Sequence, residues 1–242
     1  MSSGAEMFAR YAYAPNQLGY CGPADAAVLR GGSDEQVRAV ARRFTGAWPY
    51  LRVMAALTGI ADPLDRSLVE SYWLGGGVGA DLDPGEFTAA LLALLGPLAG
   101  GYWTHLTPRL AAEAAANHCF HVFGVYPWSR LLRCGSGHPV RVLDSCRITW
   151  GTVLERADTE ITLRCSGLDW DGRRLSLSAE TVRSVPIRVA GYAAVPDVAP
   201  GERVAVHWGR LCGRLDDLQV DALEAGTMRQ LEVTNRRLAI RG

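Results

Sequence analysis

The sequence contains no lysine, so its 25 basic residues are all arginines, and they balance 25 acidic residues. The formal net charge at pH 7 is therefore zero. A chain without excess positive charge has no electrostatic attraction to nucleic acid or to an anionic membrane surface, so we expect neither as a partner. The missing lysine also argues against a phosphate-binding loop at 75–79, because that loop needs lysine followed by serine or threonine.

Long apolar runs and a signal peptide are also missing. The longest apolar run, around 89–98, is too short to span a membrane. The first residues lack a basic segment followed by a hydrophobic stretch. We therefore expect a cytoplasmic protein, in which the six cysteines are thiols, buried or metal-binding, rather than disulfides. There is no C-x-x-C pair, so the sequence supports neither a structural zinc site nor a thioredoxin-type redox pair. The carboxylates are scattered, so the sequence predicts no catalytic acid/base pair.

The first half of the chain reads as helices joined by Gly/Pro loops. Residues 5–23 are aromatic and predicted to be a loop. Helix starts are predicted at Pro23, Asp34, Asp62, Asp83 and Thr107, and a further helix over 50–58. These signals predict a helical domain of unspecified role over residues 1–138.

The second half reads as short, alternating segments rich in β-branched residues. Strands are predicted over 140–143, 148–154, 160–165, 174–177, 181–189 and 203–207. Turn signals lie at Asp171-Gly172 and Pro200-Gly201. Strands at this spacing suggest a small closed barrel, followed by a helix over 215–223 and a solvated tail with Arg236 and Arg237. We therefore predict an α+β protein, with an N-terminal all-α domain and, over 139–242, a small OB-like β-barrel with a short C-terminal helix.

Cys146 stands where a strand is predicted to begin, and Gly151 lets backbone pass close to another group. His207 ends a later strand-like run. We expect these two side chains to belong to one site.

Two blocks around these residues resemble the HypC/HybG/HupF family of nickel–iron hydrogenase maturation chaperones. That family begins with Met-Cys-Leu-x-Ile-Pro-Gly-x-Val, and Cys146, Gly151 and Val153 fall in this register. It later carries Pro-Asp-Val-x-x-Gly-Asp-Tyr-Val-Leu-Val-His-x-Gly, then Leu-Asp and an acidic helix. The corresponding residues here are Pro196-Asp197-Val198, Gly201-Glu202, Val204, Val206-His207, Gly209 and Leu215-Asp216. The resemblance departs at Arg147 and Trp150, at the mid-chain position of the cysteine, and in the helical first half, which has no counterpart.

The resemblance implies an accessory protein that binds a maturation scaffold or the precursor of the hydrogenase large subunit. It further implies that Cys146 carries iron bearing cyanide and carbon monoxide, with His207 as a nearby polar group of the site. A soft thiolate suits such iron. Trp150, Trp208 and Asp216 would then contact the partner. An alternative is a non-catalytic binding module that stays with an assembled hydrogenase.

Two further constellations remain as alternatives. His118 and His121 would share a helix face and bind a metal, with a third ligand from Cys134 or His138; the two histidines would otherwise pack in the core or enlarge the site around Cys146. Cys21 precedes a predicted helix start, which would lower its pKa and suit a cysteine-dependent enzyme.

Overall fold

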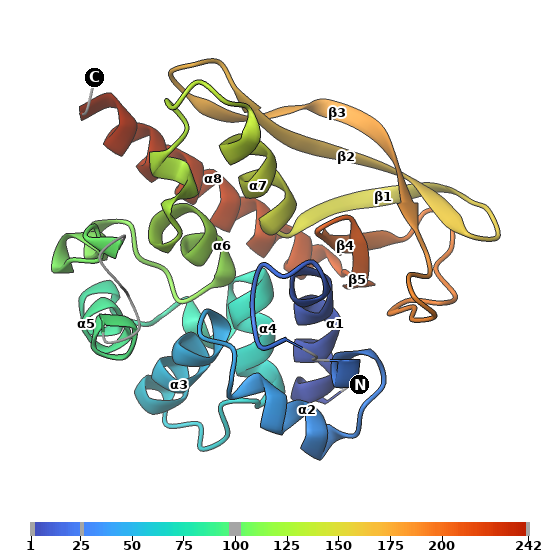
Figure 1. Ribbon diagram of the computed structural model, residues 1–242, viewed down its shortest axis with the longest axis horizontal. Helices are drawn as coiled ribbons and strands as arrows, with labels where there is room; N and C mark the ends of the chain where they lie inside the picture. The colour runs from blue at the N-terminus through green and yellow to red at the C-terminus, as the bar shows by residue number, and fades with distance from the viewer. Residues whose placement is uncertain (1–2, 25–26, 97–102, 241–242) are drawn as a thin grey trace. The chain divides into compact units, whose positions relative to one another are not determined.

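The computed structural model describes residues 3–24, 27–96 and 103–240 (Figure 1). The chain divides into two compact units, Met1–Pro127 and Trp128–Gly242. The sequence predicted a boundary at residue 138, and the compact units divide after residue 127. Among the described residues, no helix is both long and apolar enough to cross a membrane.

The elements described in the first unit are helical. They are α1 (Gly4–Gln17), η1 (Ala27–Arg30), α2 (Asp34–Ala41), α3 (Ala47–Thr58), α4 (Arg66–Leu74), η2 (Gly77–Gly79), α5 (Pro84–Leu95), η5 (Pro108–Ala112), α6 (His118–Phe120) and the π-helical turn η6 (His121–Val125). The starts predicted from capping residues are confirmed for α2, where Ser33 and Gln36 form a capping box, and for α5, where Asp83 accepts from the Glu86 N–H. Side-chain acceptors of this kind satisfy the free N–H groups of a helix start.

Three predictions in this unit are wrong. The loop predicted over 5–23 is wrong for residues 5–17, which lie in α1, and residues 18–23 are turns, bends and coil. The aromatic side chains of α1 recur at helical spacing and are buried: Phe8 packs edge-on against Phe44 at 5.2 Å and Tyr11 stacks on Trp73 at 5.6 Å between ring centroids. The helix predicted from Thr107 forms only the 3₁₀ turn η5 before α6 begins. After Pro23, residues 25 and 26 lie outside the described residues, and 27–30 form a 3₁₀ turn.

The second unit joins helices to one antiparallel sheet. Its elements are η7 (Pro127–Arg130), α7 (His138–Cys146), β1 (Thr149–Arg156), β2 (Glu160–Trp170), β3 (Leu175–Pro186), β4 (Arg203–His207), β5 (Arg210–Arg214) and α8 (Asp217–Ile240). The strand order is β3-β2-β1-β4-β5. The α+β class is therefore correct. The predicted barrel is not closed, since β3 and β5 are the two edges of the described sheet.

The sheet differs from the prediction in three places. Residues 140–143 are not a strand; they lie in α7, whose buried residues Pro139, Val142, Leu143 and Cys146 follow helical spacing. The two segments 174–177 and 181–189 form one strand, β3, paired with β2 around the Asp171-Gly172 turn. Strand β5 was not predicted, because it follows β4 after only two residues. The strand predicted over 203–207 is confirmed as β4.

Helix α8 continues well beyond the predicted end at residue 223 and includes Arg236 and Arg237. Arg237 is not part of a solvated tail: its guanidinium donates to Ser129 Oγ at 2.8 Å. Arg133 likewise donates to the Leu238 carbonyl at 3.0 Å. These bonds join the C-terminal half of α8 to the start of the second unit.

One apolar core holds the sheet together. Its buried members come from all five strands and from the segment between β3 and β4: Val153, Ile161, Leu163, Cys165, Val185, Ile187, Val195, Val198, Val204, Val206 and Leu211. Because side chains alternate along a strand, the other face of β1 carries Trp150 and Thr152, both partly exposed. The core therefore fixes the register of β1 and β4, the strands that flank the candidate site.

Candidate functional site

Cys146 is the last residue of α7, and the sequence prediction that it begins a strand is wrong. The helix ends there because Arg147 leaves helical backbone geometry, and its N–H bonds to the Leu143 carbonyl at 3.0 Å. The Cys146 side chain is 6% exposed. The chain enters β1 three residues later, so the cysteine lies at the junction between helix and sheet.

His207 is the last residue of β4 and is 1% exposed. It pairs with Arg210 across a two-residue turn formed by Trp208 and Gly209. Both turn residues have positive φ, 51° and 69°, as expected in the type I′ turns that suit hairpins. The Trp208 N–H donates to the Ser145 carbonyl at 2.8 Å. This bond brings the hairpin tip to the end of α7.

The structure places Cys146 and His207 together. The Cys146 Sγ and a ring nitrogen of His207 lie within 4.8 Å of each other. The two residues come from different elements far apart in the sequence. A thiolate and an imidazole at this separation are suitable ligands for a soft or borderline transition metal. They fill two coordination positions, so a metal bound here would need further ligands.

Of the three residues predicted to contact a partner, Trp150 lies four residues after Cys146, Trp208 directly follows His207, and Asp216 directly precedes α8. Trp150 lies on β1 with the Arg147 guanidinium carbon 5.7 Å from its ring centroid, within cation–π range. Asp216 forms a capping box with Gln219: the Gln219 N–H donates to the Asp216 carboxylate at 2.8 Å, and the Asp216 N–H donates back at 3.1 Å. Asp216 therefore has a structural role at the start of α8.

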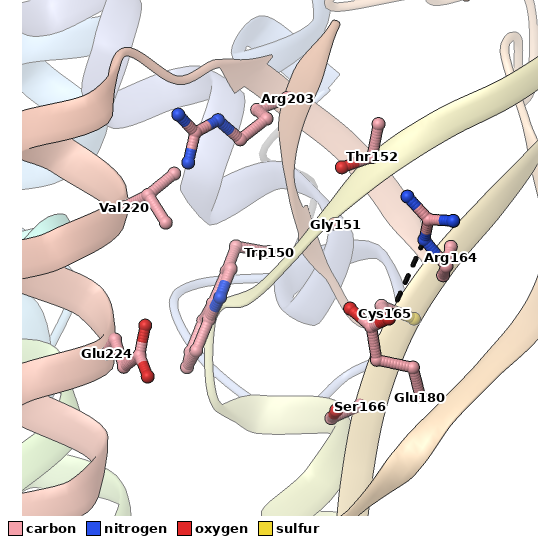
Figure 2. A pocket seen from close by; sticks show the side chains of 10 residues that line it. All are labelled: Trp150, Gly151, Thr152, Arg164, Cys165, Ser166, Glu180, Arg203, Val220 and Glu224. Carbon is pink, nitrogen blue, oxygen red and sulfur yellow. Dashed lines mark ion pairs between the residues drawn. The ribbon is translucent and has the colours of Figure 1, made fainter. Parts of the chain in front are cut away.

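A cavity of about 240 Å³ lies between the outer face of the sheet and α8 (Figure 2). It is lined by Trp150, Gly151, Thr152, Arg164, Cys165, Ser166, Glu180, Arg203, Val220 and Glu224. Its two arginines are already paired, Arg164 with Glu180 at 3.6 Å and Arg203 with Asp217. Cys146 and His207 are not among the lining residues, so this cavity is distinct from the cysteine–histidine pair.

His118 and His121 belong to the first unit, and both are buried. They stack with ring centroids 6.0 Å apart. His118 Nδ1 lies 3.3 Å from the Tyr72 hydroxyl. Burial lowers the pKa of His121 to about 4 and raises that of Tyr50, which packs edge-on against the His121 ring. A neutral imidazole is the ligating form, so metal binding by these histidines stays a prediction.

The residues predicted as a third ligand for these histidines, Cys134 and His138, belong to the second unit. Cys134 is exposed, and the His138 ring packs edge-on against Trp128 with centroids 5.3 Å apart.

Cys21 does not have the environment predicted for a nucleophile. Burial raises the pKa of its thiol to about 12, whereas the sequence predicted a lowered pKa from a helix start. The 3₁₀ turn η1 begins only at residue 27. At neutral pH the Cys21 thiolate is therefore a very small fraction of the population, which argues against a cysteine-dependent reaction at this residue.

Sequence reasoning missed the residues that surround Cys146, namely Asp144, Ser145 and Arg147. Arg147 is 1% exposed and is bonded to Asp144. The available signal was an arginine placed between apolar residues at the end of a helical pattern, where a charge needs a buried partner.

The chain belongs to a family of unknown function, DUF6390, whose model matches residues 1–241. The match extends over both units, so the helical first unit is part of the family's architecture. Neither a curated protein nor a solved structure matches the chain.

Proposed function

We propose that this DUF6390 protein is an accessory protein of nickel–iron hydrogenase maturation. It would bind a scaffold protein or the large-subunit precursor, and Cys146 with His207 would form the site that receives iron bearing cyanide and carbon monoxide. The observation that carries the proposal is the proximity of Cys146 Sγ and His207, whose ligand atoms lie within 4.8 Å. Both residues were selected from the sequence by their match to functional positions of the HypC/HybG/HupF family.

The two selected residues come from separate blocks of the resemblance, so a chance match gives no reason for them to lie close together. Other residues of the second block also have definite roles in the fold. Val198 is fully buried in the sheet core, Gly201 takes a positive φ of 86° before β4, and Glu202 accepts from the Ala199 N–H at 2.9 Å. These roles support a shared local architecture around His207.

Iron is the cargo in this proposal, and the chemistry of the pair suits it. Thiolate sulfur binds low-spin iron with strong-field ligands well, and imidazole is a common second ligand. The remaining coordination positions are left for cyanide, carbon monoxide and a ligand from the partner protein. The proposal implies a cytoplasmic protein with reduced thiols.

The test is an anaerobic affinity purification of the tagged protein from its own host, grown while hydrogenase is made. We expect a hydrogenase large subunit or a maturation scaffold to co-purify, with iron in the complex. The Cys146→Ser variant should lose the iron. Cys134→Ser is the matched control, because Cys134 is an exposed cysteine of the same unit and its loss should change nothing. Purification without any hydrogenase or maturation protein would refute the proposal.

The burial of the pair favours a second candidate function. Cys146 and His207 are 6% and 1% exposed, so transfer of iron requires that they first become accessible. A binding module that stays with an assembled hydrogenase has no such requirement. In that case Cys146→Ser would co-purify the same partner as the wild type, and the complex would contain no iron bound through this cysteine.

A further inference from the structure

Each residue next to Cys146 is fixed by a contact with another element. The family that this chain resembles carries its cysteine at a free chain end, whereas Cys146 ends a helix in mid-chain. The last turn of a helix has unsatisfied carbonyls and tends to fray. A metal ligand at such a position needs neighbours that hold its backbone.

Arg147 provides the first of these contacts. It is 1% exposed, and its Nε donates to Asp144 Oδ1 at 3.2 Å. Its guanidinium also donates to the Ser166 carbonyl on β2 and lies over the Trp150 ring on β1. A guanidinium offers donors in a rigid planar fork, so these contacts fix the direction in which the chain leaves Cys146.

Asp144 provides the second contact and connects α7 to two strands. Its carboxylate accepts from the Leu168 N–H at 2.9 Å, next to an irregularity in β2, and from Arg183 of β3 at 3.2 Å. Gly167 leaves room for the Arg183 guanidinium, which would have to shift if a Cβ were present there. The charge of buried Arg147 is thus matched by a carboxylate that is itself anchored to the sheet, as a buried ion pair requires.

Ser145 provides the third contact through its carbonyl, which accepts from the Trp208 N–H at 2.8 Å. Trp208 makes this bond with a φ of 51°, a backbone conformation that bulky residues rarely adopt. Such a conformation persists only where the surrounding structure enforces it. The bond fixes the residue before Cys146 to the residue after His207.

We propose that Asp144 and Arg147 are positioning residues that hold the Cys146 thiol toward His207. We call the contacts of Asp144 and Arg147 with Ser166, Leu168 and Arg183 the clamp. That the clamp serves a preorganised metal site rests on the proposed function, whereas its contacts are observed in the structure. Groups that orient a metal ligand without touching the metal commonly change metal affinity by about 10- to 100-fold. Asp144 and Arg147 act through Cys146.

The test measures cobalt(II) binding to the purified full-length protein under anaerobic conditions, by the thiolate-to-cobalt absorption band. Arg147→Met keeps an unbranched side chain but removes the fork, and Asp144 retains Arg183 and the Leu168 N–H as partners. We expect its cobalt affinity to fall by about tenfold or more. Arg147→Lys should recover part of the loss. Arg236→Met is the matched control, because Arg236 is an exposed arginine of the same unit whose printed ion pair is with Glu232 on α8, away from the contacts of Asp144 and Arg147.

A role in stability alone would lower the melting temperature of Arg147→Met and leave the cobalt affinity of the folded protein unchanged, and that result would overturn the proposal. If Arg147→Met fails to fold, Asp144→Asn replaces it, because the amide keeps an acceptor for the Leu168 N–H and weakens only the hold on arginine.

If the wild type binds no cobalt, the proposed metal function fails while the clamp is still tested by alkylation of Cys146, followed by mass spectrometry. Cys165 is the internal reference, since burial raises its pKa and it lies in the sheet core. The clamp predicts that Cys146 is alkylated faster in Arg147→Met than in the wild type, because the end of α7 would then open more often and expose the thiol. Equal rates would overturn it.

Discussion

At the scale of single residues, the sequence predicted that Cys146 and His207 belong to one site. It did not predict the residues that hold Cys146 in place. The pairing followed from two short blocks of sequence with fixed spacing. Asp144 and Arg147 act through contacts with Ser166, Leu168 and Arg183, which lie on strands whose register the sequence does not specify. A side chain whose role depends on a distant strand cannot be recognised from its own sequence neighbours.

His121 carries a prediction at this scale. Its pKa in the folded protein is about 4, against about 6.5 in an unfolded chain. The unfolded state therefore binds more protons between these values, so the free energy of unfolding should be constant above pH 6.5 and fall as the pH drops toward 4. The difference corresponds to about 3 kcal/mol at most. Urea unfolding measured at several pH values tests it.

His121→Phe is the matched variant for this measurement, because it keeps an aromatic ring beside Tyr50 and Tyr126 and removes the titrating group. Its stability should depend less on pH between 4 and 6.5 than that of the wild type. Equal slopes in the two proteins would show that His121 is not the group responsible.

At the scale of elements, capping residues predicted some helix starts correctly, although Thr107 is followed only by the 3₁₀ turn η5. The type of element was mistaken where only an apolar run was present. Asp34 and Asp83 marked the starts of α2 and α5 correctly. The run 140–143 was assigned to a strand because its valines favour β structure, although residues 139, 142, 143 and 146 share one helix face. The contacts of α7 with β2 decided between the two, and such long-range packing overrides local propensity.

Helix α8 offers a prediction at this scale. Asp216→Ala removes the carboxylate that accepts from the Gln219 N–H and leaves the backbone N–H that donates to the Gln219 side chain. The loss of this cap should lower the free energy of unfolding by about 1 kcal/mol. Hydrogen exchange should rise in the first turn of α8. Asp221→Ala is the control, since Asp221 is also an exposed acid of α8 but lies beyond the cap. A loss of equal size in both variants would mean that charge, and not capping, is responsible.

At the scale of the whole molecule, the sequence predicted an α+β protein, and the structure agrees at that level. It did not predict that the sheet stays open. Closure depends on whether the edge strands β3 and β5 meet, and this is set by strand length, twist and bulges such as those in β1 and β2. The alternation of apolar residues along a strand specifies which face of the sheet is buried. It does not specify whether the two edge strands pair with each other.

The two units each have buried apolar residues of their own, and this leads to a last prediction. Val204 is fully buried in the sheet core and Val69 is fully buried in α4. Val204→Ala should destabilise the second unit by about 2 kcal/mol through loss of packing, and Val69→Ala should do the same in the first unit. If local unfolding follows the units, hydrogen exchange will rise mainly on the mutated side of Pro127 in each variant. A rise of similar size on both sides in both variants would mean that the chain unfolds as one cooperative body, and the Cys146–His207 site would then depend on the helical unit for its stability.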